Sequence, residues 1–179
     1  MGSLSEKQKQ FLEDYLEFAT DTFGVDSKGV LNTALVCMGE RDGCLTGLQG
    51  ENAEFVTGLC EEYGIPYVSD NNGVFFAKSE SHLSQYPPVG ADAKTTGKFL
   101  GYPDTAIEFY QTHSDPTSES DKFLSEHSNF DESDWSSWYL IEYIPESTEA
   151  AYKEAKRKQE QYEEALKYCS VDFSGVRNL

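Results

Sequence analysis

The chain has 179 residues, of which 38% are hydrophobic and 13% aromatic, and its formal net charge at pH 7 is −18. This length and apolar content suffice for one folded domain with its own core and argue against a disordered chain. The acidic charge argues against nucleic acid or an anionic membrane as a partner, because phosphates would be repelled over most of the surface. The acid excess suits a cytoplasm rich in salt, as in a halophilic organism, and an ordinary acidic protein has the same composition.

Targeting segments and metal-binding cysteine patterns are not visible in the sequence. No apolar run approaches the roughly 20 residues that a membrane span needs, and MGSLSEKQKQ lacks a signal-peptide core. We therefore expect a cytoplasmic protein. The cysteines have neither CxxC nor zinc-site spacing and are expected to be buried thiols, so we predict no metal and no cofactor; they are Cys37, Cys44, Cys60 and Cys169.

The N-terminal part predicts a helix, a strand and a loop. Residues 3–23 have apolar side chains at helical spacing and begin with a capping box of Ser3 and Glu6. The apolar run VLNTALVCM, residues 30–38, is bounded by glycines and is typical of a strand. The glycine-rich stretch 40–50 that follows is expected to be a loop.

A second helix and a hairpin follow. The helix is expected over residues 52–63 and ends at Gly64. Residues 66–79 contain two strand-like runs around Asn72 and Gly73, a dipeptide that tolerates the positive φ angles of a tight turn. The sequence DNNG also resembles part of a calcium loop, but it lacks the spaced acids and terminal Glu, which favours the turn.

The rest of the chain predicts mainly helices. They include a short one at 80–86, one capped by Asp92 that runs to Leu100, a short piece around Phe123 and Leu124, and a long final helix from Ser147 to about Cys169. The β-forming run WYLIEYI, residues 138–144, predicts a strand before the final helix.

These elements predict the α+β class in one domain. About four strands, two of them in the hairpin, form a small antiparallel or mixed sheet that packs with five or six helices. The domain covers residues 1–179. Its parts are an N-terminal helix at 1–24, a mixed core at 30–145 and a C-terminal helix at 147–170.

A sharp corner is predicted within 97-GKFLGYPDTAIEFY-110. Gly101 stands just past Leu100, where a helix ends with a residue that accepts a left-handed conformation. Pro103 suits the first position of the next helix, and Tyr102 before it is excluded from helical geometry. Asp104 then opposes the positive end of the second helix.

The run from about Tyr63 to His113, with 75-FFAKSESHLSQ-85 and the corner, resembles a family of uncharacterised, largely archaeal proteins. That family has Gly-Tyr-Pro-x-Cys-Cys at the corner and a strand that ends in Pro-Cys, a position matched here by 141-IEYIPESTEA-150. The resemblance covers roughly two thirds of the chain and implies no established activity.

The departures from this family concern its cysteines. Thr105 and Ala106 stand where the family has paired cysteines, and Glu146 stands after Pro145 where the family has Cys. The resemblance therefore implies a retained scaffold from which a cysteine site has been lost. The alternative is that the carboxylates of Asp104 and Glu146 take the place of the family's thiols as metal ligands, which would favour a harder metal ion.

The favoured hypothesis is a non-catalytic binding or protein-interaction module with a cleft beside the corner, whose partner is an unknown protein or small molecule. Tyr102 and Tyr143 would provide contact area and Lys98 a charge for an anionic group. Asp104 and Glu146 would be polar anchors.

The rival hypothesis is a small hydrolase or transferase assisted by a divalent ion. It would use Asp104, Glu108, His113 and Glu146. The simpler interpretation of these residues is a solvated helix face in an acidic protein. The cluster KEAKRK, residues 153–158, is either a grip for a phosphate or acidic partner, or a set of helical ion pairs with nearby glutamates.

Overall fold

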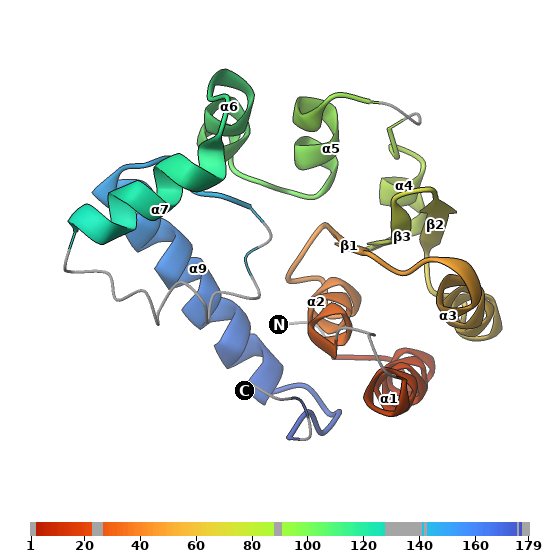
Figure 1. Ribbon diagram of the computed structural model, residues 1–179. Helices are drawn as coiled ribbons and strands as arrows, with labels where there is room; N and C mark the ends of the chain where they lie inside the picture. The colour runs from red at the N-terminus through yellow and green to blue at the C-terminus, as the bar shows by residue number, and fades with distance from the viewer. Residues whose placement is uncertain are drawn as a thin grey trace.

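The computed structural model describes residues 3–22, 27–87, 91–127, 141, 143–174 and 176. Over these residues the chain is α+β, as predicted, with eight helices and a three-stranded sheet (Figure 1). The helices are α1 (Glu6–Asp21), α2 (Ser27–Cys37), α3 (Gly50–Tyr63), α4 (Glu80–Leu83), α5 (Ala93–Phe99), α6 (Asp104–Thr112), α7 (Pro116–Glu126) and α9 (Glu149–Lys167). None of them is long and apolar enough to cross a membrane in the part of the chain that is described.

The sheet is antiparallel with the order β1-β3-β2, and its strands are β1 (Gly43–Thr46), β2 (Tyr67–Asp70) and β3 (Gly73–Ala77). The hairpin of β2 and β3 confirms the prediction at Asn72 and Gly73. Gly73 has a φ of +134°, and a Cβ atom there would overlap with the Thr46 carbonyl oxygen. All five residues of β3 are buried, because helices cover both faces of this central strand.

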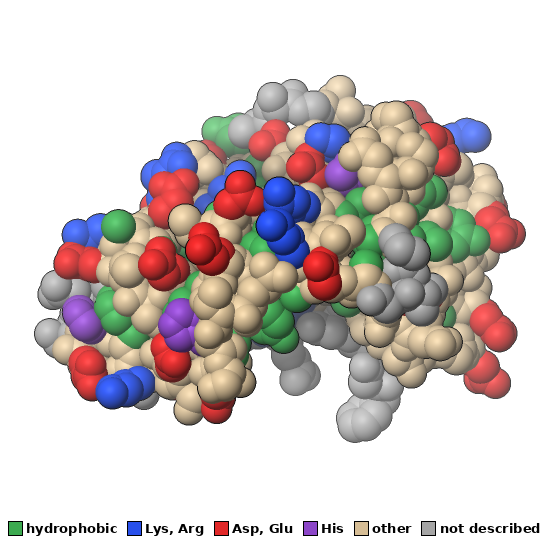
Figure 2. All heavy atoms as spheres, turned by 90° about the horizontal axis from the view of Figure 1, so that it is seen from above, with side chains coloured by type: hydrophobic (Ala, Val, Ile, Leu, Met, Phe, Trp, Pro, Cys, Tyr) green, Lys and Arg blue, Asp and Glu red, His purple; other side chains and the backbone are tan. Residues whose placement is uncertain are grey.

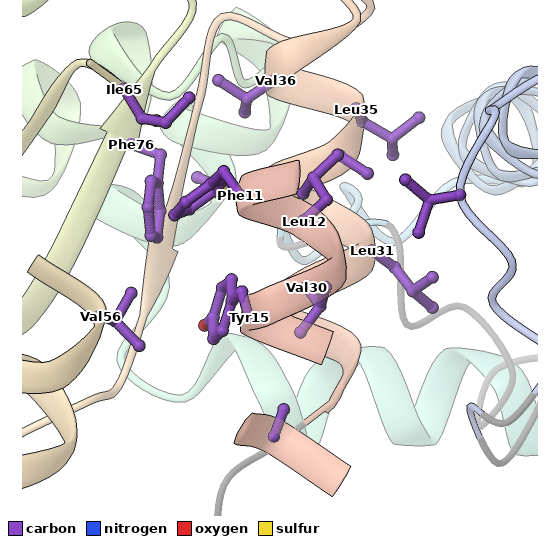
Figure 3. Packing of buried hydrophobic residues seen from close by; sticks show 14 of the residues in the cluster. Phe11, Leu12, Tyr15, Val30, Leu31, Leu35, Val36, Val56, Ile65 and Phe76 are labelled. Atoms are coloured by element: carbon purple, nitrogen blue, oxygen red, sulfur yellow. The ribbon is translucent and has the colours of Figure 1, made fainter. Parts of the chain in front are cut away.

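The main core lies between α1, α2, α3, one face of the sheet and the end of α9. The Phe76 ring of β3 lies 6.0 Å from the Phe11 ring and 6.1 Å from the Tyr15 ring, measured between centroids. Figure 3 shows these three aromatic rings beside the aliphatic side chains of α2. Such aromatic packing accounts for much of the apolar area that folding removes from water.

The strand predicted at residues 30–38 is wrong, because this segment belongs to α2. The helix packs against α1, β1, β3 and α9, so most of its side chains are buried and the usual alternation of apolar and exposed polar faces is lost. Gly39, with a φ of +76°, ends the helix, and its N–H donates to the Val36 carbonyl at 3.0 Å. The loop predicted at 40–50 is also wrong, since β1 lies within it.

The first helix begins later than predicted. The capping box consists of Ser5 and Gln8 rather than Ser3 and Glu6. The Gln8 N–H donates to the Ser5 hydroxyl at 3.2 Å, and the Ser5 N–H donates to the Gln8 side-chain oxygen at 2.9 Å. A glutamine closes this motif as well as a glutamate does.

The second face of the sheet is covered by α4 and α5. The buried residues there form the corner-side cluster, which consists of Phe75, Ala77, Phe99 and Leu100. The His82 ring stacks on the Phe99 ring with 4.6 Å between centroids, and its Nε2 lies 2.8 Å from the Phe99 carbonyl oxygen. These contacts join the end of α5 to α4 and the sheet.

The helices α7 and α9 pack together in a smaller group, the C-terminal cluster of Leu124, Ile141, Tyr152 and Ala155. The Ser120 hydroxyl of α7 is hydrogen-bonded to the Tyr152 hydroxyl of α9. The final helix is therefore confirmed, with slightly narrower bounds than predicted. Most of the predicted strand 138–144 lies outside the described residues, and Ile141, Tyr143 and Ile144 are described without strand structure.

Candidate functional site

The corner between α5 and α6 is closed by backbone hydrogen bonds. Gly101 has a φ of +76°, and its N–H donates to the Lys98 carbonyl at 3.1 Å. The Tyr102 N–H donates to the Gly97 carbonyl at 2.9 Å. These two bonds form a Schellman motif, in which the left-handed residue lets the chain turn away from the helix. The predicted role of Gly101 is confirmed.

The second helix starts one residue later than predicted. Pro103 has a φ of −58° and a ψ of 140°, so it is the N-cap of α6 rather than its first residue, and Asp104 begins the helix. Because its ring fixes the φ of Pro103, this residue still restricts the direction in which α6 leaves the corner. Thr105 is exposed and Ala106 is buried.

Gly97 permits the close approach of α5 and α6. A Cβ atom at Gly97 would lie 2.9 Å from Cγ1 of Ile107 and 3.5 Å from Cδ2 of Tyr102. The first of these distances is shorter than carbon atoms in contact tolerate. The two helices therefore pack more closely here than any larger residue would permit.

The segment before α9 reaches the corner, as the hypothesis required. The rings of Tyr102 and Tyr143 lie 5.6 Å apart between centroids with an interplanar angle of 51°. This tilted contact is within the range in which aromatic pairs attract each other. It places the residues just before Pro145 beside the start of α6.

A cavity of about 330 Å³ opens at this contact, and we call it the corner pocket. Its walls are mostly apolar and come from α5, the corner, α6 and the segment before Pro145. They are formed by Ala93, Thr96, Gly97, Tyr102, Ala106, Ile107, Tyr110, Tyr143 and Ile144. Ala106 is one of the two positions at which the resembled family would have cysteine.

A second cavity of about 260 Å³ is also bordered by the two tyrosines, and we call it the basic pocket. It extends from the corner to α9 and to Arg41, which precedes β1. Its lining contains three basic side chains and one acidic one. The residues are Arg41, Leu100, Gly101, Tyr102, Pro103, Tyr143, Glu154, Arg157, Lys158 and Tyr162.

The basic side chains of this pocket are held in place by neighbours. Arg41 is only 5% exposed, and its guanidinium donates to the Asn32 side-chain oxygen at 2.5 Å. The Lys158 ammonium lies 4.7 Å and the Arg41 guanidinium carbon 5.6 Å from the Tyr162 ring centroid. Both distances are within the range of cation–π attraction. Arg157 donates to both carboxylate oxygens of Glu154, at 3.0 and 2.5 Å.

The hydroxyl of Tyr143 stays neutral in this setting. Burial raises its pKa to about 12, and the nearby Tyr162 and Glu154 act in the same direction, whereas Arg41 opposes them. A neutral phenol donates a hydrogen bond but is no general base at neutral pH. Tyr143 can therefore contribute a ring face and a donor to either pocket.

Of the five residues predicted to bind a ligand, Tyr102 and Tyr143 line both pockets, and the other three line neither. Lys98 and Asp104 form an exposed ion pair, with 3.8 Å between Nζ and Oδ1. The lysine therefore balances the first carboxylate of α6 rather than facing the pockets. The backbone carbonyl oxygen of Glu146 accepts a hydrogen bond from the Thr148 N–H, with 2.6 Å between nitrogen and oxygen.

The residues of the rival enzyme hypothesis do not form a metal-binding group. His113 Nε2 lies 3.4 Å from Oε2 of Glu119 on α7, and its Nδ1 lies 2.9 Å from the Phe109 carbonyl oxygen. Asp104 is paired with Lys98. Among the residues that the structure describes, no three histidine, cysteine, aspartate or glutamate side chains are placed to hold a metal ion.

The cysteines lie in or against the main core. Cys44 and Cys60 are buried, and Cys37 and Cys169 are half-buried. Burial and the neighbouring Cys169 raise the pKa of Cys37 to about 12. Thiols of this kind are poor nucleophiles at neutral pH.

Sequence reasoning missed Arg41, Tyr110 and Tyr162. Arg41 lies in the stretch predicted as a loop, and Tyr162 lies in the predicted final helix, where no motif marked it as a site residue. The scarcity of arginine was one available signal in the sequence. The chain has only three arginines, and two of them, Arg41 and Arg157, line the basic pocket.

The surface around the site is acidic without a single acidic patch. Seen from above (Figure 2), acidic side chains are spread over the face that carries α5 and α6, with basic ones among them.

Comparison with known proteins found no matching family model, no similar curated protein and no similar solved structure. The resemblance to the archaeal family therefore stays a prediction.

Proposed function

We propose that the protein is a non-catalytic binding module whose corner pocket takes the apolar group of a small ligand. The observation that carries this proposal is the cavity of about 330 Å³ with mostly apolar walls. A buried apolar cavity of about 150 Å³ is enough to bind benzene, and ligand pockets begin at roughly 300 Å³. The corner pocket has room for one ring with a short chain.

The chemistry of the walls favours binding over catalysis. The nine residues that line the corner pocket include no carboxylate, imidazole, ammonium or thiol group. The hydroxyls of the one threonine and three tyrosines in the walls become nucleophiles or general bases only when such a group activates them. Tyrosine rings provide rigid contact area at a low cost in conformational entropy, which suits recognition.

Isothermal titration calorimetry with 4-phenylbutan-1-ol tests this proposal. The alcohol has one ring and a short chain, matching the size of the pocket, and it carries no charge. Tyr110 lines the pocket and is 52% exposed, so its replacement should leave the fold intact. We expect Tyr110→Ala to weaken binding by about tenfold, as expected for the loss of an aromatic contact.

Two further variants control the experiment. Tyr168→Ala also removes an exposed helical-end tyrosine, 65% exposed, from a position that lines neither pocket, and should leave binding unchanged. Ala106→Phe fills the pocket from its buried side and should abolish binding. Circular dichroism checks that each variant is folded. No binding by the unmodified chain, or equal binding by all variants, would overturn the proposal.

A further inference from the structure

We infer that the ligand is a small carboxylic acid with one aromatic ring, bound with its ring in the corner pocket and its carboxylate in the basic pocket. This inference rests on the proposed function and adds the chemical class of the ligand. It is motivated by two differently lined cavities that share one pair of side chains, Tyr102 and Tyr143.

The two pockets adjoin at Tyr102 and Tyr143. Both side chains line both cavities, and their rings are in contact at 5.6 Å between centroids. A molecule that occupies both pockets therefore contacts these tyrosine rings. An aromatic ring with a chain of a few carbons has this shape, with an apolar part on one side and a polar end on the other.

Charge then selects the polar end. The basic pocket combines Arg41, Arg157 and Lys158 with a single carboxylate, Glu154, in a chain whose net charge is −18. Glu154 is engaged by Arg157 in a two-pronged ion pair, so it repels an incoming anion less than an isolated carboxylate would. Few other places on this acidic chain bring several cationic side chains together, so an anion is attracted to this pocket more than to most of the surface.

Lys158 is the cation best suited to contact the anion. It lies over the Tyr162 ring, which fixes its Nζ at 4.7 Å from the ring centroid within the pocket lining. Its three N–H donors form charge-assisted hydrogen bonds with a carboxylate. Arg41, nine-tenths buried and bonded to Asn32, adds positive potential from the pocket floor.

A single negative charge fits better than two. The Arg157–Glu154 pair already uses part of the local positive charge. The acidic surface also raises the cost of bringing a second negative charge to the site. A carboxylate is therefore favoured over a phosphate monoester.

The test compares matched probes that share a phenyl ring on a four-carbon chain and differ in the group at its end. Binding of 4-phenylbutyrate, 4-phenylbutan-1-ol and 4-phenylbutyl phosphate is measured by calorimetry at low salt. We expect the carboxylate to bind at least about tenfold more tightly than the alcohol, the gain of one charge-assisted hydrogen bond. This advantage should shrink as salt is added, because the attraction is screened.

Lys158→Gln identifies the charge responsible. The variant keeps a long polar side chain on a partly exposed helix position and should remove most of the carboxylate's advantage while leaving alcohol binding unchanged. Lys153→Gln is the matched control. It removes a cation from the same helix that is paired with Glu149 at 2.6 Å and lines neither pocket, so it should preserve the advantage.

The outcomes separate the two proposals. If alcohol and carboxylate bind equally, or if Lys158→Gln and Lys153→Gln behave alike, the inference is overturned while the binding module stands. Tighter binding of the phosphate than of the carboxylate overturns the assigned ligand class. If none of the probes binds, both the proposed function and this inference fail.

Discussion

The main core and the corner differ in how they use large apolar side chains. In the main core, Phe11, Tyr15 and Phe76 are fully or almost fully buried against one another and against α2. At the corner, Tyr102 and Tyr143 are only partly buried and border two cavities. The first arrangement stabilises the fold and the second leaves aromatic surface for a ligand. Stability and recognition therefore belong to separate regions, and single substitutions can distinguish them.

The largest expected effect lies in the main core. Leu31, on α2, is 0% exposed and Leu124, in the C-terminal cluster, is 5% exposed. We expect Leu31→Ala to lower the free energy of unfolding by about 4 kcal/mol and Leu124→Ala by about 2 kcal/mol, because the smaller cluster can collapse around the lost volume. Urea denaturation followed by circular dichroism measures both. Equal losses would show that the two regions are packed alike.

The next effect tests the close approach of the two helices at the corner. Gly97→Ala places a methyl group 2.9 Å from Ile107 and should destabilise the protein by about 2 kcal/mol through overpacking. Gly58→Ala is the control, since Gly58 is exposed within α3 and a Cβ there meets nothing within 4 Å. This control should stabilise the protein by about 0.5 kcal/mol, the ordinary gain of alanine over glycine in a helix. Stabilisation by both substitutions would contradict the packing described here.

A smaller effect concerns the pH dependence of stability. The pKa of Tyr143 in the folded chain is about 12, above its ordinary value of 10.0. Folding therefore holds this proton more tightly, and the resulting stabilisation is complete below about pH 10 and is lost as the pH rises through about 12. Tyr143→Phe has no such proton to lose. Between about pH 9 and pH 11.5 its stability should fall less than that of the unmodified chain, by at most about 1 kcal/mol after screening by solvent.

This comparison removes the contribution of other tyrosines. Tyr63 donates a hydrogen bond to Asp14, and its pKa is also raised to about 12, so it contributes to the same alkaline loss in both proteins. Parallel stability curves for the unmodified chain and Tyr143→Phe would show that Tyr143 ionises in the folded state as readily as in the unfolded state.

The smallest effect is expected at the exposed ion pair of the corner. Lys98 and Asp104 are 3.8 Å apart, with side chains 56% and 85% exposed. Lys98→Gln should change the free energy of unfolding by less than about 0.5 kcal/mol, because water screens such pairs. It should also leave binding of 4-phenylbutyrate unchanged. A large loss of affinity would restore Lys98 to the ligand site in place of Lys158.

The elements that could be predicted from sequence are those with local chemical signals. Asn72 and Gly73 specify a tight turn, and Gly101 before Tyr102 and Pro103 specifies a helix end followed by a change of direction. Such signals act over a few residues and do not depend on the rest of the fold. The favoured hypothesis placed Tyr102 and Tyr143 at one cleft beside the corner, and their rings are in contact.

The failures concern features that depend on tertiary packing. The sequence of α2 resembles that of a strand because the helix contacts other elements on several sides and therefore lacks the continuous polar face of a typical surface helix. Arg41 precedes β1 in sequence and reaches Tyr162 on α9, a contact that no sequence spacing indicates. The lining of the basic pocket comes from three separate parts of the chain, and the sequence alone does not show that they meet.

The most direct test of the ligand site is methyl NMR on isoleucine-labelled protein during titration with 4-phenylbutyrate. The isoleucines at 65, 107, 141 and 144 sample different regions. Ile107 and Ile144 line the corner pocket, Ile65 belongs to the main core and Ile141 to the C-terminal cluster. We expect the Ile107 and Ile144 methyl signals to shift in a saturable manner while that of Ile65 stays fixed. Saturable binding with unmoved Ile107 and Ile144 signals would contradict the corner pocket as the ligand site.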